Sequence, residues 1–191
     1  TIPPRSVKNK TLQYGRNIKV SEDGMHLYSE VTGHVSLTEG KVFVSDVYEV
    51  PADVDTSTGD IHYAGSVHIR GNVRGGFVVT SQGDIVVDGS VEDAMLQAEG
   101  DIIVKCGIQG MQRGVLDAKG NIITKYIENA KVFAGGYIET GSIIYSEVGA
   151  GEDVIVAEKK GFINGGIVRA GGKVEANSIG SAMGAHTIIE V

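Results

Sequence analysis

The chain has 191 residues, a formal net charge of −7, and 28 glycines against three prolines. The acidic balance argues against sequence-independent binding to nucleic acid, because phosphates require a basic footprint. No apolar run approaches the roughly 18 residues that a membrane span needs, so we expect no direct membrane insertion. The single Cys106 cannot form an internal disulfide, which indicates a reducing, cytoplasmic setting.

Residues 1–50 show strand-like alternation without a repeat. Apolar and polar residues alternate in 25–28 and 41–47, and the dipeptides Asp23-Gly24 and Glu39-Gly40 have the composition of tight turns. We therefore predict short antiparallel strands that form an N-terminal β cap or small subdomain over residues 1–50.

From residue 51 onward the chain repeats a short pattern. Seven times a small residue, here called an anchor, is followed four places later by a β-branched aliphatic residue. The anchors are Ser57, Ser81, Ala98, Ala118, Ala134, Ala150 and Ala170, and their aliphatic partners are Ile61, Ile85, Ile102, Ile122, Ile138, Val154 and Val174. Because a repeat this short cannot bury its own apolar side, the copies must stack and share one core.

Each repeat predicts three short strands. Period-two alternation places Ile102 and Val104 on one inward face, and an apolar residue two places before each anchor gives a second inward row, as Leu96 does. A third strand is predicted around Val91, Ile108, Ile127 and Ile143. Glycine with Asp or Asn at 83–84, 100–101 and 120–121 fits corners that need positive φ or side-chain capping. The sequence thus predicts an all-β parallel β-solenoid over residues 51–191, with about seven coils of 16–20 residues.

Three separated segments resemble the flagellar assembly protein A family. They are residues 53–59 (DVDTSTG), 125–136 (KYIENAKVFAGG) and 179–181 (IGS), and the resemblance extends from about Gly15 to Val191. It implies a right-handed β-solenoid in a cytoplasmic, non-enzymatic bacterial protein, with an additional N-terminal region and a coiled-coil-like C-terminal part. The strand-like run 187–191 fits the expectation of such a further C-terminal region. The architecture is similar in kind to bactofilins and to the C-terminal domain of the septum-site inhibitor of cell division, both of which self-associate.

The outward positions provide a candidate interaction surface. The residue after each inward aliphatic residue is His62 in the first coil, and it is apolar in four later coils: Val86, Ile103, Ile123 and Ile155. The first three of these would form a contiguous apolar ladder, which monomers seldom expose. The N-terminal segment could fold over it, a symmetric dimer or lateral filament contact could bury it, or it could remain exposed.

Two coils carry inserted segments that are candidate docking loops. They span residues 109–114 and 158–165, and we expect both to emerge from the same side of the solenoid. Loops on a rigid scaffold are frequent sites of recognition. The candidate contact residues are Gln109, Met111, Arg113, Lys159, Lys160 and Phe162.

Enzymatic functions find little support in the residues. There is no Trp and aromatic residues make up 6%, which leaves few platforms for a polysaccharide substrate. Residues 53–64 begin like a calcium loop, but the glycine comes one place late and no glutamate occupies the bidentate position. An acyltransferase would need a histidine, and the candidates His62 and His68 lie among ordinary strand residues.

We therefore predict a non-catalytic scaffold of the flagellar assembly protein A type, with no cofactor and no metal site. It would act through self-association and protein docking, as a homo-oligomer with a protein partner that the sequence does not identify. The alternatives are a carbohydrate-binding or polysaccharide-active β-helix protein, a bactofilin-like cytoskeletal polymer and an acyltransferase.

Overall fold

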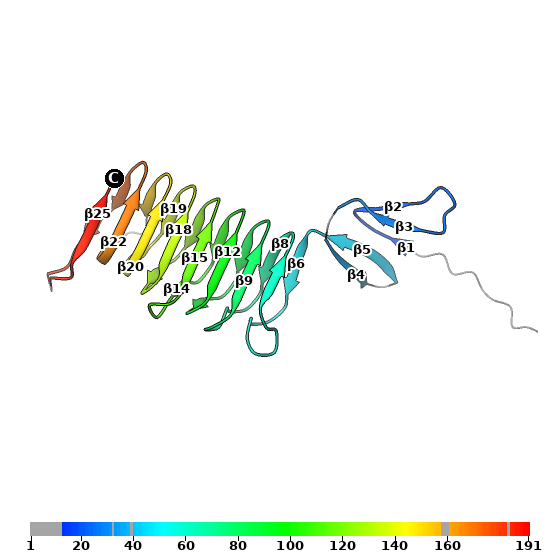
Figure 1. Cartoon of the computed structure of the whole chain (residues 1–191), viewed down its shortest axis with the longest axis horizontal. Helices are drawn as coiled ribbons and strands as arrows, with labels where there is room; N and C mark the ends of the chain where they lie inside the picture. The colour runs from blue at the N-terminus through cyan, green and yellow to red at the C-terminus, as the bar shows by residue number, and fades with distance from the viewer. Residues whose placement is uncertain (1–12, 32, 39, 158–160, 183) are drawn as a thin grey trace, which may run out of the picture. The chain divides into compact units, whose positions relative to one another are not determined.

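The structure is a computed structural model that describes residues 13–31, 33–38, 40–157, 161–182 and 184–191. All of its regular elements are strands, and the chain divides into two compact units, residues 1–46 and 47–191. In the second unit, successive strands stack into a regular array (Figure 1). The predicted all-β parallel solenoid is confirmed.

The first unit contains two small sheets. One has the order β1-β5-β4, and the other is an antiparallel pair of β2 and β3. The strands are β1 (Gln13–Tyr14), β2 (Ile18–Val20), β3 (Leu27–Ser29), β4 (His34–Thr38) and β5 (Lys41–Ser45). Gly24 and Gly40, in the two predicted turns, have φ angles of 67° and 77°, which glycine adopts without strain.

The second unit is a solenoid with three faces, here called faces 1, 2 and 3, and along each coil the chain runs from face 1 to face 3 and then to face 2. Face 1 holds β6 (Val47–Val50), β8 (Ser66–Ile69), β10 (Ile85–Val87), β13 (Ile102–Val104), β16 (Ile122–Thr124), β19 (Ile138–Thr140), β21 (Val154–Val156) and β23 (Val174–Ala176). Every pairing along face 1 is parallel, and its eight strands correspond to about eight turns.

Faces 2 and 3 share two long strands that bend around the corner between them. Face 3 holds β11 (Val91–Glu92), β14 (Ile108–Gln109), β17 (Ile127–Glu128), the first parts of β20 (Ser142–Ala150) and β22 (Phe162–Ala170), and β24 (Ser178–Ile179). Face 2 holds β7 (Ile61–Tyr63), β9 (Val78–Ser81), β12 (Met95–Ala98), β15 (Val115–Ala118), β18 (Lys131–Ala134), the second parts of β20 and β22, and β25 (Thr187–Glu190). The third strand of each coil is therefore where the sequence predicts it.

The core consists of inward rows in which equivalent residues of successive coils lie next to each other. Leu96 pairs with Val79 and Leu116, and Ile122 pairs with Ile102 and Ile138. All of these side chains are fully buried. Each such side chain contributes about 1.5–3 kcal/mol by burial, and neighbouring coils share the contacts.

The first predicted anchor is wrong. Ser57 is exposed, and Ile61 begins β7 on face 2, where it pairs with Val79. The residue that pairs with Ile85 is Val67 of β8. The first step is longer than the others because it contains an additional face 2 strand, β7, before the face 1 strand β8.

The glycines at the corner between faces 2 and 1 are required by space. A Cβ atom on Gly100 would lie 2.1 Å from Asp84 Oδ1, which accepts a hydrogen bond of 2.9 Å from the Asp101 amide. Asp101 Oδ1 in turn accepts one of 2.7 Å from the Asn121 amide. Of the two predicted alternatives, side-chain capping is therefore the one found at this corner, and the positive φ angles of the solenoid occur at the corner between faces 3 and 2.

A charge in an inward row should unfold the stack. We expect Ile122→Asp to cost on the order of 4 kcal/mol or more, because the carboxylate would be buried between two aliphatic neighbours. The matched control is Ile123→Asp in the same strand, whose side chain points outward and should be tolerated. Thermal denaturation followed by circular dichroism tests this, and equal melting temperatures for the two variants would contradict the assigned register.

Candidate functional site

The apolar ladder exists on the outer surface of face 1. Val86 pairs with Ile103 and Ile103 pairs with Ile123, so the three side chains lie side by side on adjacent strands. Each is partly exposed. Glu139 follows Ile123 in register and separates it from Ile155, so Ile155 is not contiguous with the other three. We use the term apolar ladder for Val86, Ile103 and Ile123.

The end of the ladder next to Val86 is polar, as is the end next to Ile123. His68, and not His62, lies in register with Val86. His68 Nε2 is 3.0 Å from Asp88 Oδ1, and its Nδ1 is 3.4 Å from Glu49 Oε1. The ladder is therefore a short apolar strip between a histidine on one side and a glutamate on the other.

The loop at residues 110–114 projects between β14 and β15. Gln109 belongs to β14. Met111 and Arg113 lie within the loop, where Met111 is 66% exposed and the Arg113 side chain is 83% exposed. The Arg113 guanidinium is paired with the carboxylate of Asp93, whose side chain is 8% exposed. This ion pair connects the loop to the preceding coil, so the Arg113 charge is balanced.

The second predicted loop differs from the expectation. Phe162 is the first residue of β22 and pairs with Ser142 and Ser178, so it belongs to a strand. Lys159 and Lys160 lie outside the described residues. β21 on face 1 is followed by β22, which begins on face 3, whereas the loop at 110–114 follows β14 on face 3 and precedes β15 on face 2, so the two insertions do not lie between the same pair of faces. The reason is that β22 keeps its face 3 register with β20, which places the extra residues before that face.

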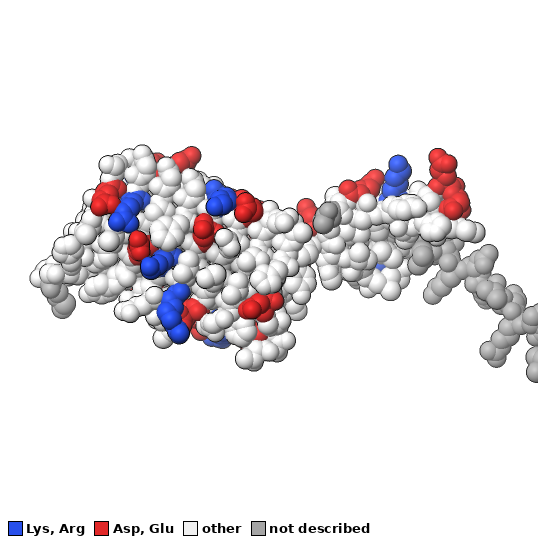
Figure 2. All heavy atoms as spheres, viewed as in Figure 1, with Lys and Arg blue, Asp and Glu red and all other residues white. Residues whose placement is uncertain are grey.

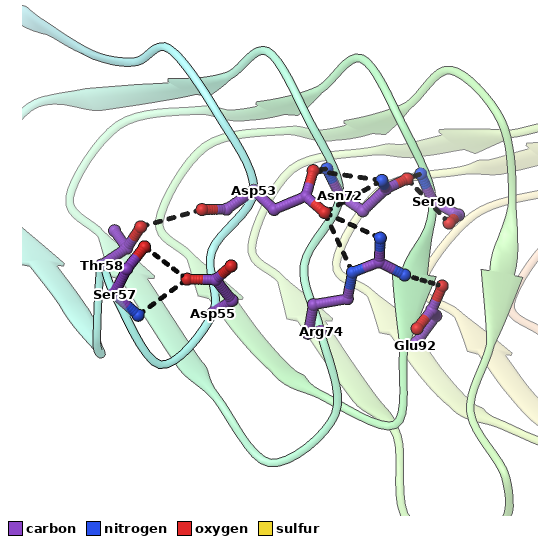
Figure 3. A network of polar contacts seen from close by, with 8 residues as sticks. All are labelled: Asp53, Asp55, Ser57, Thr58, Asn72, Arg74, Ser90 and Glu92. Atoms are coloured by element: carbon purple, nitrogen blue, oxygen red, sulfur yellow. Dashed lines mark hydrogen bonds and ion pairs between the residues drawn. The ribbon is translucent and has the colours of Figure 1, made fainter.

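A polar network joins the first coils at the corner before face 3 (Figure 3). Asp53 Oδ1 accepts a hydrogen bond of 2.8 Å from the Asn72 amide, and Asn72 Oδ1 accepts one of 2.9 Å from the Ser90 amide. Arg74 donates to Asp53 Oδ2 through Nε at 2.9 Å and to Glu92 Oε1 through Nη1 at 2.8 Å. The network connects three successive coils and was not predicted, although Asp53, Arg74 and Glu92 recur about one coil apart in the sequence.

Residues 53–64, which begin like a calcium-binding loop, form a turn. The carboxylate of Asp55 accepts hydrogen bonds from the amide and the hydroxyl of Ser57, at 2.7 and 2.6 Å. The carboxylate of Asp53 is directed instead at Asn72 and Arg74 (Figure 3). Within the described ranges, no group of three or more His, Cys, Asp or Glu side chains is arranged to hold a metal ion.

The polar contacts of Asp53, Asp55 and Asp88 favour the ionised form of their carboxylates. The amide of Asn72, together with its side chain and the Arg74 guanidinium, lowers the pKa of Asp53 below its ordinary value of 3.8. Hydrogen bonds from Ser57 lower the pKa of Asp55 in the same direction. Lys105 and His68 hold the pKa of Asp88 far below its usual range. The folded state therefore gains stability from these groups above about pH 4 and loses it as the pH falls.

The two histidines lie on different faces. His62 Nδ1 is 2.7 Å from the hydroxyl of Thr80 on face 2, while His68 contacts Asp88 and Glu49 on face 1. Basic and acidic side chains are interspersed over the solenoid surface seen in Figure 2. That view shows no single-sign patch of the kind that a nucleic-acid interface requires. None of the described segments forms a helix with the length and apolar character needed to cross a bilayer.

Comparison with known proteins identifies one family. A family model described as the Flagellar Assembly Protein A beta solenoid domain matches residues 46–191, which is the solenoid unit almost to the residue. No curated protein and no solved structure matches the chain.

The polar network should make stability depend on pH. We expect Asp53→Asn to lower the melting temperature at pH 7 by about 2–4 °C, because the charge-assisted bond to Arg74 is lost. As the pH falls below 4 the wild-type carboxylate becomes protonated, so the difference between wild type and variant should shrink. Melting curves at several pH values measure this. Asp117→Asn is the control, because the Asp117 carboxylate makes no hydrogen bond or ion pair to the described residues. A difference between wild type and Asp53→Asn that stays constant with pH would contradict the assignment.

Proposed function

We propose that this chain, which belongs to the flagellar assembly protein A family through its β-solenoid domain, is a non-catalytic cytoplasmic scaffold that associates with a second copy and docks other proteins. The observation that carries the proposal is the apolar ladder on face 1. A partly exposed apolar strip on a rigid sheet is a typical centre for an interface with a polar rim.

The ladder is held in place before any partner binds. Each of its strands is hydrogen-bonded to a neighbour on both sides, and the residues beside Ile103, which are Ile102 and Val104, are buried in the core. Little conformational entropy is therefore lost when the surface is covered, and preorganisation of this kind favours association.

The row formed by the apolar ladder, with His68 at one end and Glu139 at the other, is also self-complementary. A two-fold axis through Ile103 would bring Val86 of one copy against Ile123 of the other. It would place the His68 end of each row beside the Glu139 end of the other, so that the two Glu139 carboxylates stay apart. Such an isologous contact fits the closed symmetry of most homodimers. We therefore propose a second copy as the occupant of the ladder.

Docking of other proteins is assigned to the loop at 110–114. Met111 is 66% exposed there, and the pairing of Arg113 with Asp93 holds the base of the loop. An exposed methionine on an anchored loop offers an adaptable apolar contact.

The association is tested by measuring absolute mass with light scattering over a wide concentration range. We expect the wild type to dimerise and Ile103→Lys to weaken the dimer by roughly 100-fold, because the two-fold axis would bring two ammonium groups together. At a concentration at which both proteins are monomeric the melting temperature should not change, since the side chain points outward.

Gln97→Lys is the matched control for this experiment. It adds the same charge to an exposed position on β12 of face 2 and should leave the dimer intact. A wild type that remains monomeric at all concentrations would rule out self-association through the ladder. Loss of the dimer in both variants would assign the contact to another surface.

A further inference from the structure

Tyr145 occupies a corner position that most coils fill with a residue tolerant of positive φ. In these coils the residue that follows the face 3 segment turns the chain onto face 2. At this position Asp93, Asn129 and Gly165 have φ angles of 42°, 49° and 72°, and Tyr145 has 46°. Glycine, asparagine and aspartate adopt this region readily, whereas an aromatic residue is strained there.

Packing explains the tyrosine only in part. Its side chain is 57% exposed, so burial does not offset the strain. The ring lies against the backbone of Gly165, where a Cβ atom would be 2.5 Å from Tyr145 Cδ1. The remainder of the ring is open to solvent. Strained residues that the fold does not require are concentrated at functional sites, so the conformation indicates a role for the exposed ring.

A shallow groove of about 300 Å³ lies beside the ring. Its lining includes Gln112, Asn129, Lys131, Tyr145, Glu147 and Ile167. Lys131 Nζ is 3.5 Å from Glu147 Oε2, and Arg169 Nη1 is 3.2 Å from Glu147 Oε1 while its Nε pairs with Glu190, so two cations and two carboxylates balance one another. The volume is at the lower end of the range for small-molecule sites, which suits a ligand of one or two rings.

We propose that this groove binds a neutral sugar. The paired charges favour an uncharged ligand over an anion or a cation. The amides of Gln112 and Asn129 and the Lys131–Glu147 pair offer both donors and acceptors, as a ligand rich in hydroxyl groups requires. The open face of Tyr145 and the side chain of Ile167 match the flat C–H face of a pyranose ring.

The sugar site is separate from the apolar ladder. The ladder is on face 1, whereas the groove is at the corner of faces 3 and 2, and the two share no residue. The groove does share Gln112 with the proposed docking loop. An Ile103→Lys variant should therefore bind sugar as the wild type does, and the proposals of a sugar site and of a dimer through the ladder succeed or fail independently.

The test uses saturation-transfer NMR with cellobiose, maltose and the disaccharide of N-acetylglucosamine, each added at millimolar concentration to the full chain. We expect transfer from the wild type to at least one of them and at least a tenfold loss of affinity in Tyr145→Asn, which removes the ring. Because asparagine tolerates positive φ, this variant should melt at the same temperature or up to about 2–4 °C higher. Tyr145→Phe should retain binding, since the ring remains.

Tyr126→Asn is the matched control. The Tyr126 ring also lies against a glycine, Gly107 of the preceding coil, whereas the Tyr145 ring lies against Gly165 of the following coil. Tyr126 has no positive φ and does not line the groove. This variant should bind sugar normally. The proposal is overturned if no disaccharide shows transfer, if Tyr145→Asn binds like the wild type, or if Tyr145→Asn melts at a lower temperature, which would make the ring structural. A change of mass in Tyr145→Asn without any sugar binding would assign the groove to a protein contact instead.

Discussion

The parallel register between successive coils is the constraint on which the rest of the structure depends. Ile122 is buried because Ile102 and Ile138 lie directly beside it in the neighbouring strands, and the same holds in every inward row. A slip of one residue would exchange inward and outward side chains and place Ile123 in the core. No coil can satisfy this condition alone, so the stack is specified collectively, and the outward positions have fixed places on a rigid surface.

The corners accommodate the close approach of consecutive coils that this register imposes. Consecutive coils approach so closely that side-chain oxygens of one coil reach the amides of the next, as Asp84 does with Asp101. The same contact leaves no space for a Cβ atom on Gly100. The network of Asp53, Asn72 and Ser90 repeats this arrangement at another corner, and its amide donors lower the pKa of Asp53. The close approach of consecutive coils at the corners thus explains the position of the glycines, the side-chain capping and the sensitivity of stability to acid.

The sequence carries most of this fold because inward rows leave a periodic apolar signal. That signal was sufficient for the three strands per coil and for the side-by-side arrangement of Val86, Ile103 and Ile123. It failed where connections vary in length. Ile61 copies the motif yet belongs to face 2, and Phe162 follows an insertion yet begins a strand, since register is decided by the neighbouring coil. The corner that requires positive φ has no fixed residue type, so Tyr145 could not be recognised as an exception without the backbone angles.

The apolar ladder and the Tyr145 groove differ in what they cost the stability of the fold. The apolar ladder follows the local rules of a strand, so an isoleucine there costs the fold nothing and only its exposure is unusual. Tyr145 breaks the local rule at its corner, and its partly exposed ring gains little from burial. A residue that is tolerated can persist by chance, whereas one that is strained requires a compensating advantage. The strained backbone of Tyr145 therefore favours a ligand at this groove whether or not the ladder pairs with a second copy.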